Sequence, residues 1–189
     1  VSPWSTCEVA SSAVVLVSIG TTVLYAAFNK NLLGFAGSSA AEVSWVLNAD
    51  TIVYATMLIP AGGIADKFGR KKIFMLGVLF FLVASLACGL ATSVIWLICA
   101  RVLQAVGAAL LSPASLSLIL EAFPQSKRAV AVSSWGAVGE LAAALGPGLG
   151  SFIIDTVGWQ WAFYINIPVG LICMWRGITV LKESVNPRD

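Results

Sequence analysis

Three charged side chains stand inside long apolar stretches of the sequence, where a charge has chemical consequences. Asp50 and Arg101 each lie about seven residues from the same end of their stretch, and Glu140 lies near the middle of another. At about 1.5 Å per helical residue, Asp50 and Arg101 are both roughly 10 Å deep. An arginine at that depth costs at least about 2.5 kcal/mol, so it faces a cavity or a partner, or it snorkels to the interface. We expect an ion pair between Asp50 and Arg101, because pairing lowers the cost of burying both.

Asp50 and Glu140 are the acids that could take up a proton within the apolar part of the chain. A carboxylate in such a place either carries a proton or attracts a cationic ligand. For Asp50 the alternative is a purely structural ion pair. For Glu140 the alternative is a solvated position on a cavity wall.

The rest of the composition argues against most catalytic chemistry. The sequence has no histidine, and its four cysteines lie in separate apolar segments without CxxC spacing. We therefore expect no metal site. Neither a nucleophile–base pair nor a nucleotide-binding loop is recognisable, so we expect neither enzymatic activity nor a bound cofactor.

The composition places the chain in a lipid bilayer. Of its 189 residues, 59% are hydrophobic and 11% are charged, against about 25% charged in soluble domains. The net charge of +2 is too small to suggest nucleic-acid binding. A helix needs about 20 apolar residues to span the hydrocarbon core. Six stretches qualify, and they cover residues 9–28, 43–65, 73–91, 94–118, 130–154 and 161–181. The alternating strands of an outer-membrane barrel are not seen, so the sequence predicts an all-α bundle of six transmembrane helices.

Basic residues indicate how the spans are oriented. If the spans alternate, one side holds Lys67, Arg70, Lys71, Lys72, Lys127, Arg128, Lys182 and Arg188, while the other holds Lys30. Cytoplasmic loops carry an excess of Lys and Arg. We therefore expect a multi-pass protein of the plasma membrane with both termini in the cytoplasm.

A short basic loop between the second and third spans carries the most specific motif. Its key positions are Gly62, Asp66, Lys67, Gly69, Arg70, Lys71 and Lys72. A plain positive-inside loop would explain the basic residues but not two glycines and an acid at this spacing. Asp66 ends a helix whose C-terminal dipole is negative, so it needs a partner such as Arg70. The loop resembles the G-x-x-x-D-R/K-x-G-R-R/K-R/K signature of the major facilitator superfamily, which implies that Asp66 and Arg70 help to latch two transporter halves in the outward-facing state.

Residues 101–109 in the fourth span carry a second resemblance. They read RVLQAVGAA and are similar to the R-x-x-Q-G-x-G segment of drug:proton antiporters in the same superfamily, with Ala105 in place of the first glycine. The resemblance implies that Arg101 takes part in proton coupling and places Gln104 in the same site.

The fifth span contains a stripe of small residues. Gly139, Ala143, Gly146 and Gly150 fall on one helical face, which lets another helix approach closely. Pro147 removes a backbone donor and should bend the helix. Together these residues resemble the antiporter motif G-x-x-x-x-x-x-G-P-x-x-G-G, which distinguishes exporters from importers in the family.

Residues 159–170 give the fourth resemblance. They are similar to the W-R-W-x-F-x-I-N-x-P-x-G run of the fourteen-helix drug:proton antiporters, with Gln160 in place of arginine. The resemblances together cover about residues 43–180. The first helix of that family usually carries an aspartate in a D-x-T-I-V pattern, and the nearest equivalent here, residues 20–27, has no acid.

Two four-residue segments suggest internal symmetry. Residues 66–69 follow the second span and residues 155–158 follow the fifth, and both read D-x-x-G. They lie on opposite sides of the membrane, as an inverted 3+3 repeat would place them.

The resemblance implies the N-terminal six-helix half, residues 1–189, of a major facilitator transporter. The function it implies is proton-coupled efflux of small amphipathic or cationic compounds, that is, multidrug export by alternating access. A second half is absent from this chain, so it must come from further sequence or from a second copy. A nutrient or metabolite transporter of the same superfamily and a non-transporting membrane module are the alternatives.

Overall fold

The computed structural model describes residues 2–29 and 38–184, and every regular element in these ranges is a helix. The helices are α1 (Pro3–Asn29), α2 (Ala40–Phe68), α3 (Arg70–Gly89), α4 (Val94–Ala122), α5 (Gln125–Val157), α6 (Trp161–Tyr164) and α7 (Asn166–Val180). They form six spans that are long and apolar enough to cross a membrane, with α6 and α7 together making the sixth. The predicted all-α, six-span architecture is confirmed.

Most helices continue beyond the apolar stretches that predicted them. α2 shows the reason, because it begins at a polar cap rather than at the first apolar residue. The Glu42 N–H donates to Ser39 Oγ at 3.3 Å, and the Ser39 N–H donates to Glu42 Oε2 at 2.8 Å. This capping box satisfies backbone donors at the helix start. Hydropathy marks where the chain crosses hydrocarbon, whereas caps decide where the helix begins.

The sixth span is divided where the sequence predicted one continuous helix. α6 ends at Tyr164, and α7 begins at Asn166. Pro168 has no N–H, so the carbonyl of Tyr164 cannot receive the usual hydrogen bond from four residues ahead. The interruption therefore follows from the proline.

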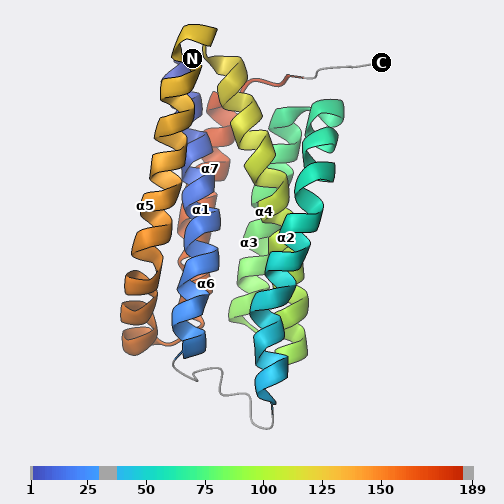
Figure 1. Ribbon diagram of the computed structural model, residues 1–189, viewed down its shortest axis with the longest axis vertical. Coiled ribbons are helices and arrows are strands. Elements are labelled where there is room, and N and C mark those ends of the chain that lie inside the picture. Colours follow the sequence, from blue (N-terminus) through green and yellow to red (C-terminus); the bar gives the residue numbers. More distant parts are fainter. Residues whose placement is uncertain (1, 30–37, 185–189) are drawn as a thin grey trace.

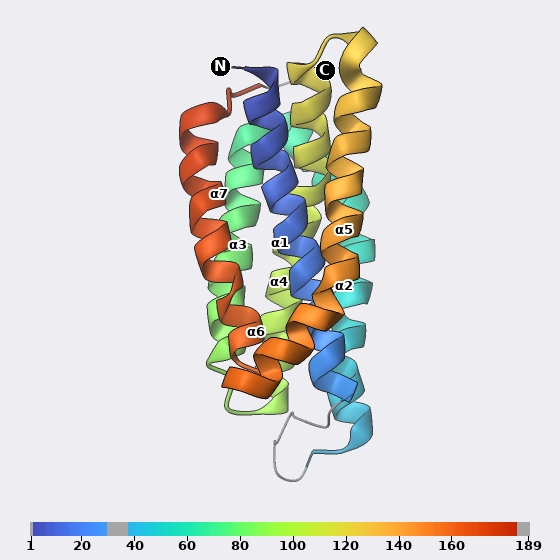
Figure 2. The same cartoon turned by 90° about the vertical axis from the view of Figure 1, so that its left-hand side faces the viewer.

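The helices lie in two layers. Figure 1 shows α5, α1, α4 and α2 in front of α3 and α7, and Figure 2 shows the same layers from the side. α1 packs mainly on α5, while α4 packs mainly on α3 and α2. In an inverted 3+3 repeat, the first, second and third spans correspond to the fourth, fifth and sixth. The α1–α5 pair then corresponds to the α4–α2 pair, and both pairs pack closely here.

Two glycines give this symmetry a local counterpart. Gly69 and Gly158 are the glycines with positive φ in the described part of the chain, at 109° and 104°. Each donates its N–H to the carbonyl four residues earlier, Ala65 O at 3.1 Å and Ile154 O at 3.2 Å. Residues with a Cβ rarely adopt this conformation. The two D-x-x-G segments therefore each end their span at a positive-φ glycine whose N–H closes the last helical turn.

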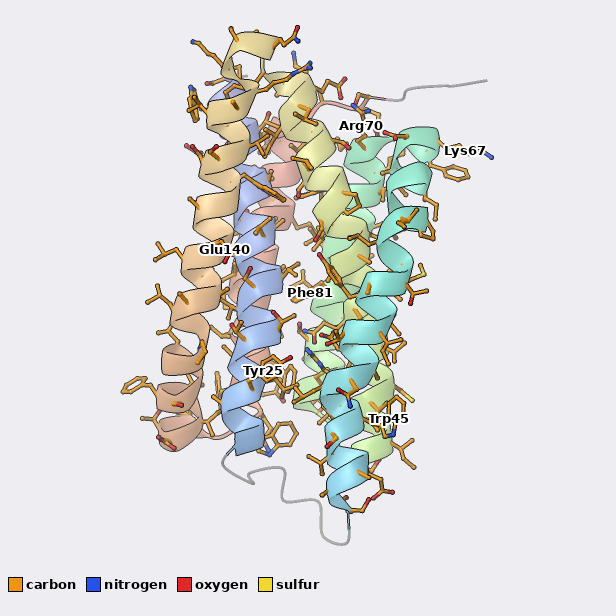
Figure 3. All side chains as sticks on the ribbon, viewed as in Figure 1. Tyr25, Trp45, Lys67, Arg70, Phe81 and Glu140 are labelled. Atoms are coloured by element: carbon orange, nitrogen blue, oxygen red, sulfur yellow. The ribbon has the colours of Figure 1, made fainter. Side chains whose placement is uncertain are left out.

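The basic loop lies at one end of the bundle. Figure 3 places Lys67 and Arg70 at that end and Trp45 at the opposite end. The start of α1 and the end of α7 lie at the same end as the loop (Figure 1), as expected for six alternating spans. Lys30 and Arg188, which contributed to the predicted orientation, lie outside the described residues.

Candidate functional site

Asp50 of α2 and Arg101 of α4 form an ion pair inside the bundle. Arg101 Nη2 lies 2.8 Å from Asp50 Oδ2, and the two side chains are 1% and 10% exposed, respectively. The predicted pair is confirmed, and the snorkelling alternative for Arg101 is wrong because the side chain stays buried. A buried pair of this kind is costly to break from one side, since the remaining charge is left uncompensated.

A chain of polar side chains extends from Arg101 into the bundle. Arg101 Nη1 donates to the carbonyl of Gly20 at 3.3 Å and to Gln104 Oε1. Gln104 Nε2 donates to Ser85 Oγ at 2.9 Å, and Asn166 Nδ2 lies 3.5 Å from the same oxygen. Arg101 Nε is buried without a hydrogen-bond partner among the described residues. Sequence reasoning placed Gln104 in this site but missed Ser85.

A cavity of about 230 Å³ opens beside the ion pair, between α1, α2 and α4. Its lining residues are Val17, Ser18, Thr21, Tyr25, Leu47, Asp50, Thr51, Tyr54 and Arg101. The walls combine aliphatic and aromatic surface with hydroxyl groups and one carboxylate, which is paired with the Arg101 guanidinium. Ligand sites are built in this way, with mainly apolar walls and a few placed polar groups. Aromatic faces and a carboxylate together suit an organic cation.

Glu140 is not brought together with the ion pair. Its side chain is exposed on α5, about half-way along the bundle (Figure 3). It does not line the cavity beside Asp50. The hydrogen bonds and ion pairs found among the described residues do not include Glu140. The structure therefore separates the two acids that the sequence grouped as proton-coupling candidates.

The basic loop forms a second charged site. Arg70 donates from Nε and Nη2 to Asp66 Oδ1 at 3.1 and 3.0 Å, which confirms the partner expected for Asp66. Arg70 Nη1 also lies 3.2 Å from Glu121 Oε2 at the end of α4. Glu121 accepts a further hydrogen bond from Ser184 Oγ. Arg70 thus links the ends of α2 and α4, a contact with Glu121 that the sequence did not signal.

The segment that leaves α7 runs back to this loop. Lys71 Nζ donates to the carbonyls of Leu181 at 2.7 Å and Ile178 at 3.1 Å, so a cation caps the C-terminus of α7. At the start of α3 the Arg70 N–H donates to the Ser184 carbonyl at 3.1 Å. A Cβ at Gly69 would overlap the carboxylate of Glu183. The exit segment and the loop therefore cap one another.

Lys67 and Gly62 of the loop make weaker contacts. Lys67 Nζ lies 5.6 Å from the ring centroid of Phe68. A Cβ at Gly62 would meet Pro113 Cβ at 3.8 Å, which is ordinary contact. These two residues do not join the Asp66–Arg70 pair.

The spacing of the small residues of α5 predicted the close approach of another helix, and that helix is α1. A Cβ at Gly139 would lie 2.5 Å from Val14 Cγ1, and one at Gly150 would lie 3.0 Å from the Val23 backbone. Pro147 lies within α5, which remains one helix. In Figure 2 the last third of α5 turns across the lower part of α1. The antiporter-like motif thus forms a close helix–helix contact.

The pattern of buried charges, the Gly-framed loop and the paired three-helix units match one known family. Residues 10–189 match the sequence model of the Major Facilitator Superfamily. The chain belongs to this superfamily. Its family and six-span fold point to transport rather than to catalysis, and the chain is a multi-pass membrane protein in contact with lipid.

Two curated superfamily relatives are resistance proteins by name. The tetracenomycin C resistance and export protein of Streptomyces glaucescens is 35% identical over 96% of this chain. The methyl viologen resistance protein SmvA of Salmonella typhimurium is 37% identical over 98% of it. The chain spans only 34% and 38% of these two relatives, so both are larger proteins.

A solved structure supports the superfamily fold. A bacterial homolog of the human lysosomal transporter Spinster, in an inward-facing and unoccupied conformation, matches with a TM-score of 0.71. The match covers 94% of this chain and 42% of that one, at 24% sequence identity. At this identity the likeness shows the fold.

Proposed function

We propose that this chain is half of an exporter that expels small amphipathic or cationic compounds in exchange for protons. The observation that carries the proposal is the buried Asp50–Arg101 pair at the wall of a cavity. An intramembrane ionisable pair facing a cavity marks an ion or substrate pathway. The resistance and export relatives support efflux as the direction.

The exchange would depend on competition for Asp50. When Asp50 is ionised, its carboxylate pairs with Arg101 and faces a cavity that also holds Tyr25 and Tyr54. A cationic compound in the cavity is attracted to the same carboxylate. A proton that neutralises Asp50 removes this attraction and favours release. Binding of the compound and binding of the proton therefore oppose each other, as antiport requires.

We assign the proton to Asp50 rather than to Glu140. Asp50 has a charged partner and lines the cavity, whereas Glu140 lies exposed on α5. The first helix supplies no acid at the position where the drug:proton antiporters have one. Glu140 would instead attract cations to the face of α5 on which its side chain is exposed.

Alternating access requires a second six-helix unit against which this one can rock. The larger size of the relatives supports a second half within a longer protein, and a second copy of this chain would serve the same purpose. The Asp66–Arg70–Glu121 cluster would form this half's part of a gate at the loop end. We place that end and both termini in the cytoplasm and the protein in the plasma membrane, in line with the basic residues there.

Inside-out vesicles from cells that express the full-length protein test this function. We expect an acidic lumen to drive accumulation of methyl viologen, a dication, in wild-type vesicles. Asp50→Asn should abolish this accumulation, while Glu140→Gln should raise the methyl viologen concentration needed for half-maximal rate and keep the dependence on the pH gradient. Unchanged gradient-driven accumulation in both variants would overturn the assignment. Movement in the opposite direction would indicate an importer, and no movement of any compound would indicate a non-transporting module.

A further inference from the structure

The polar chain behind Arg101 reaches side chains to which neither the motifs nor the comparisons give a role. Ser85 lies on α3 and is 0% exposed, and Asn166 opens α7 and is 1% exposed. Both lie within the apolar part of the bundle, where an unsatisfied polar group is costly. Their partners explain why they can be there, since Ser85 Oγ accepts from Gln104 Nε2 at 2.9 Å and lies 3.5 Å from Asn166 Nδ2.

The hydrogen bonds of Ser85 fix which way the Gln104 amide points. Because Ser85 Oγ accepts the Gln104 N–H, the amide carbonyl must face the other way, toward Arg101 Nη1. A flipped amide would aim two N–H groups at a guanidinium, which offers donors only. The Asn166 amide nitrogen lies 3.5 Å from the same hydroxyl oxygen and gives it a second, longer donor contact.

We infer that Ser85 and Asn166 are positioning residues for proton exchange, because they hold the Gln104 carbonyl on Arg101 at the moment when Asp50 is neutral. The inference rests on the proposed exchange of protons at Asp50. Once Asp50 takes up a proton, Arg101 loses its carboxylate counter-ion but keeps its charge, and the Gln104 and Gly20 oxygens remain as its acceptors. Those two oxygens therefore set how easily the ion pair opens.

The direction in which the pH profile should shift without Ser85 follows from this competition among the acceptors around Arg101. Without Ser85, the Gln104 amide is free to turn, and Arg101 then depends more strongly on ionised Asp50. The carboxylate is stabilised, and protonation requires a more acidic solution. We expect the midpoint of the pH profile of transport to fall by about 0.7 pH unit, which corresponds to about 1 kcal/mol at 1.36 kcal/mol per unit.

Few other titratable groups face the ion pair. Tyr25 of α1 and Tyr54 of α2 line the same cavity, and the Cys88 thiol of α3 lies close enough to interact with both charges. In the described part of the chain, the charged side chains that line the cavity are Asp50 and Arg101. A profile between pH 5.5 and 7.5 therefore reports on the pair.

The test is methyl viologen transport by the full-length protein in proteoliposomes, measured across that pH range. Ser85→Ala and Asn166→Ala should each move the midpoint to lower pH. Ser115→Ala is the matched control, since Ser115 is also 0% exposed but donates to the Ser112 carbonyl at 2.8 Å, away from the chain. Midpoints that equal the wild-type value, or that move equally in Ser115→Ala, would overturn the inference.

A variant that should shift the midpoint in the opposite direction covers the case in which Ser85→Ala protein is not recovered from the membrane. Gln104→Glu is close in size and gives Arg101 a second carboxylate, so Asp50 should take up a proton at higher pH. A fall in the midpoint, or no change, would refute the positioning role. The Asp50→Asn variant distinguishes a failure of the proposed function from a failure of the inference about Ser85 and Asn166. If it retains the wild-type pH profile, the proposed function fails; if it loses the profile but Ser85→Ala does not shift it, only the inference fails.

Discussion

Gly146 lies where α5 presses most closely on α1, and the substitution Gly146→Ala tests whether that contact holds the bundle together. A methyl group there would overlap Thr22 Oγ1 and lie 2.6 Å from Thr22 Cβ. Rotation of the Thr22 side chain relieves the first overlap but breaks its 2.7 Å hydrogen bond to the Ser18 carbonyl. It does not relieve the second, so the helices must separate by about 0.8 Å to restore ordinary contact at 3.4 Å. Overpacking of this kind costs about 1–3 kcal/mol.

The free energy of unfolding, measured by SDS titration in mixed micelles, gives the comparison. Gly148→Ala is the matched control, because nothing lies within 4 Å of a Cβ there. Alanine exceeds glycine in helix propensity by up to about 1 kcal/mol, so this control should be neutral or stabilising. The double variant Gly146→Ala/Thr22→Gly removes the Thr22 side chain that the new methyl group would overlap, and we expect a coupling free energy of at least about 0.5 kcal/mol. Equal stability of the two alanine variants, or additivity in the double variant, would refute close packing as the role of Gly146.

Three further outcomes follow from the polar contacts. Asp50→Asn should lower the free energy of unfolding by about 3–5 kcal/mol because it leaves Arg101 unpaired. Adding Arg101→Gln should restore part of the stability but not transport. A double variant as unstable as the single one would contradict this. Lys71→Met should remove the cap of α7 and speed tryptic cleavage after Lys182, as followed by gel electrophoresis, and wild-type cleavage rates would argue against the cap. Gly69→Ala should destabilise the protein by at least about 1 kcal/mol in the same SDS titration, because φ is positive and the methyl would overlap a carboxylate; an unchanged value would show that the loop can relax.

The sequence predicted the spans well because hydrophobicity over about 20 residues is a strong signal. It also predicted the Asp50–Arg101 pair, because matching depth on two spans is visible once the spans are known. The small-residue face of α5 was equally readable from its spacing. What the spacing could not supply was the identity of the partner helix, α1, which depends on packing across the bundle.

The missed contacts are those that join distant parts of the chain without a distinctive residue pattern. Ser85 is a single serine in an apolar helix. The sequence around it does not distinguish it from a serine whose hydroxyl group donates a hydrogen bond to the backbone of its own helix. Glu121 lies at the end of α4, and it reaches Arg70 across 51 positions of sequence. Such pairings depend on how the helices pack, which periodicity does not encode. Local motifs therefore identify candidate residues, and only the packed bundle shows which of them meet.

The most direct test of the central claim is proton release on substrate binding. Purified full-length protein in weakly buffered solution, with a pH-sensitive dye, would receive methyl viologen at a pH where Asp50 is partly protonated. If the cation and the proton compete for Asp50, wild-type protein releases protons on binding. Asp50→Asn protein should release no protons when methyl viologen is added, and Glu140→Gln protein should release them as wild type does. Proton release that persists undiminished in Asp50→Asn would contradict the account.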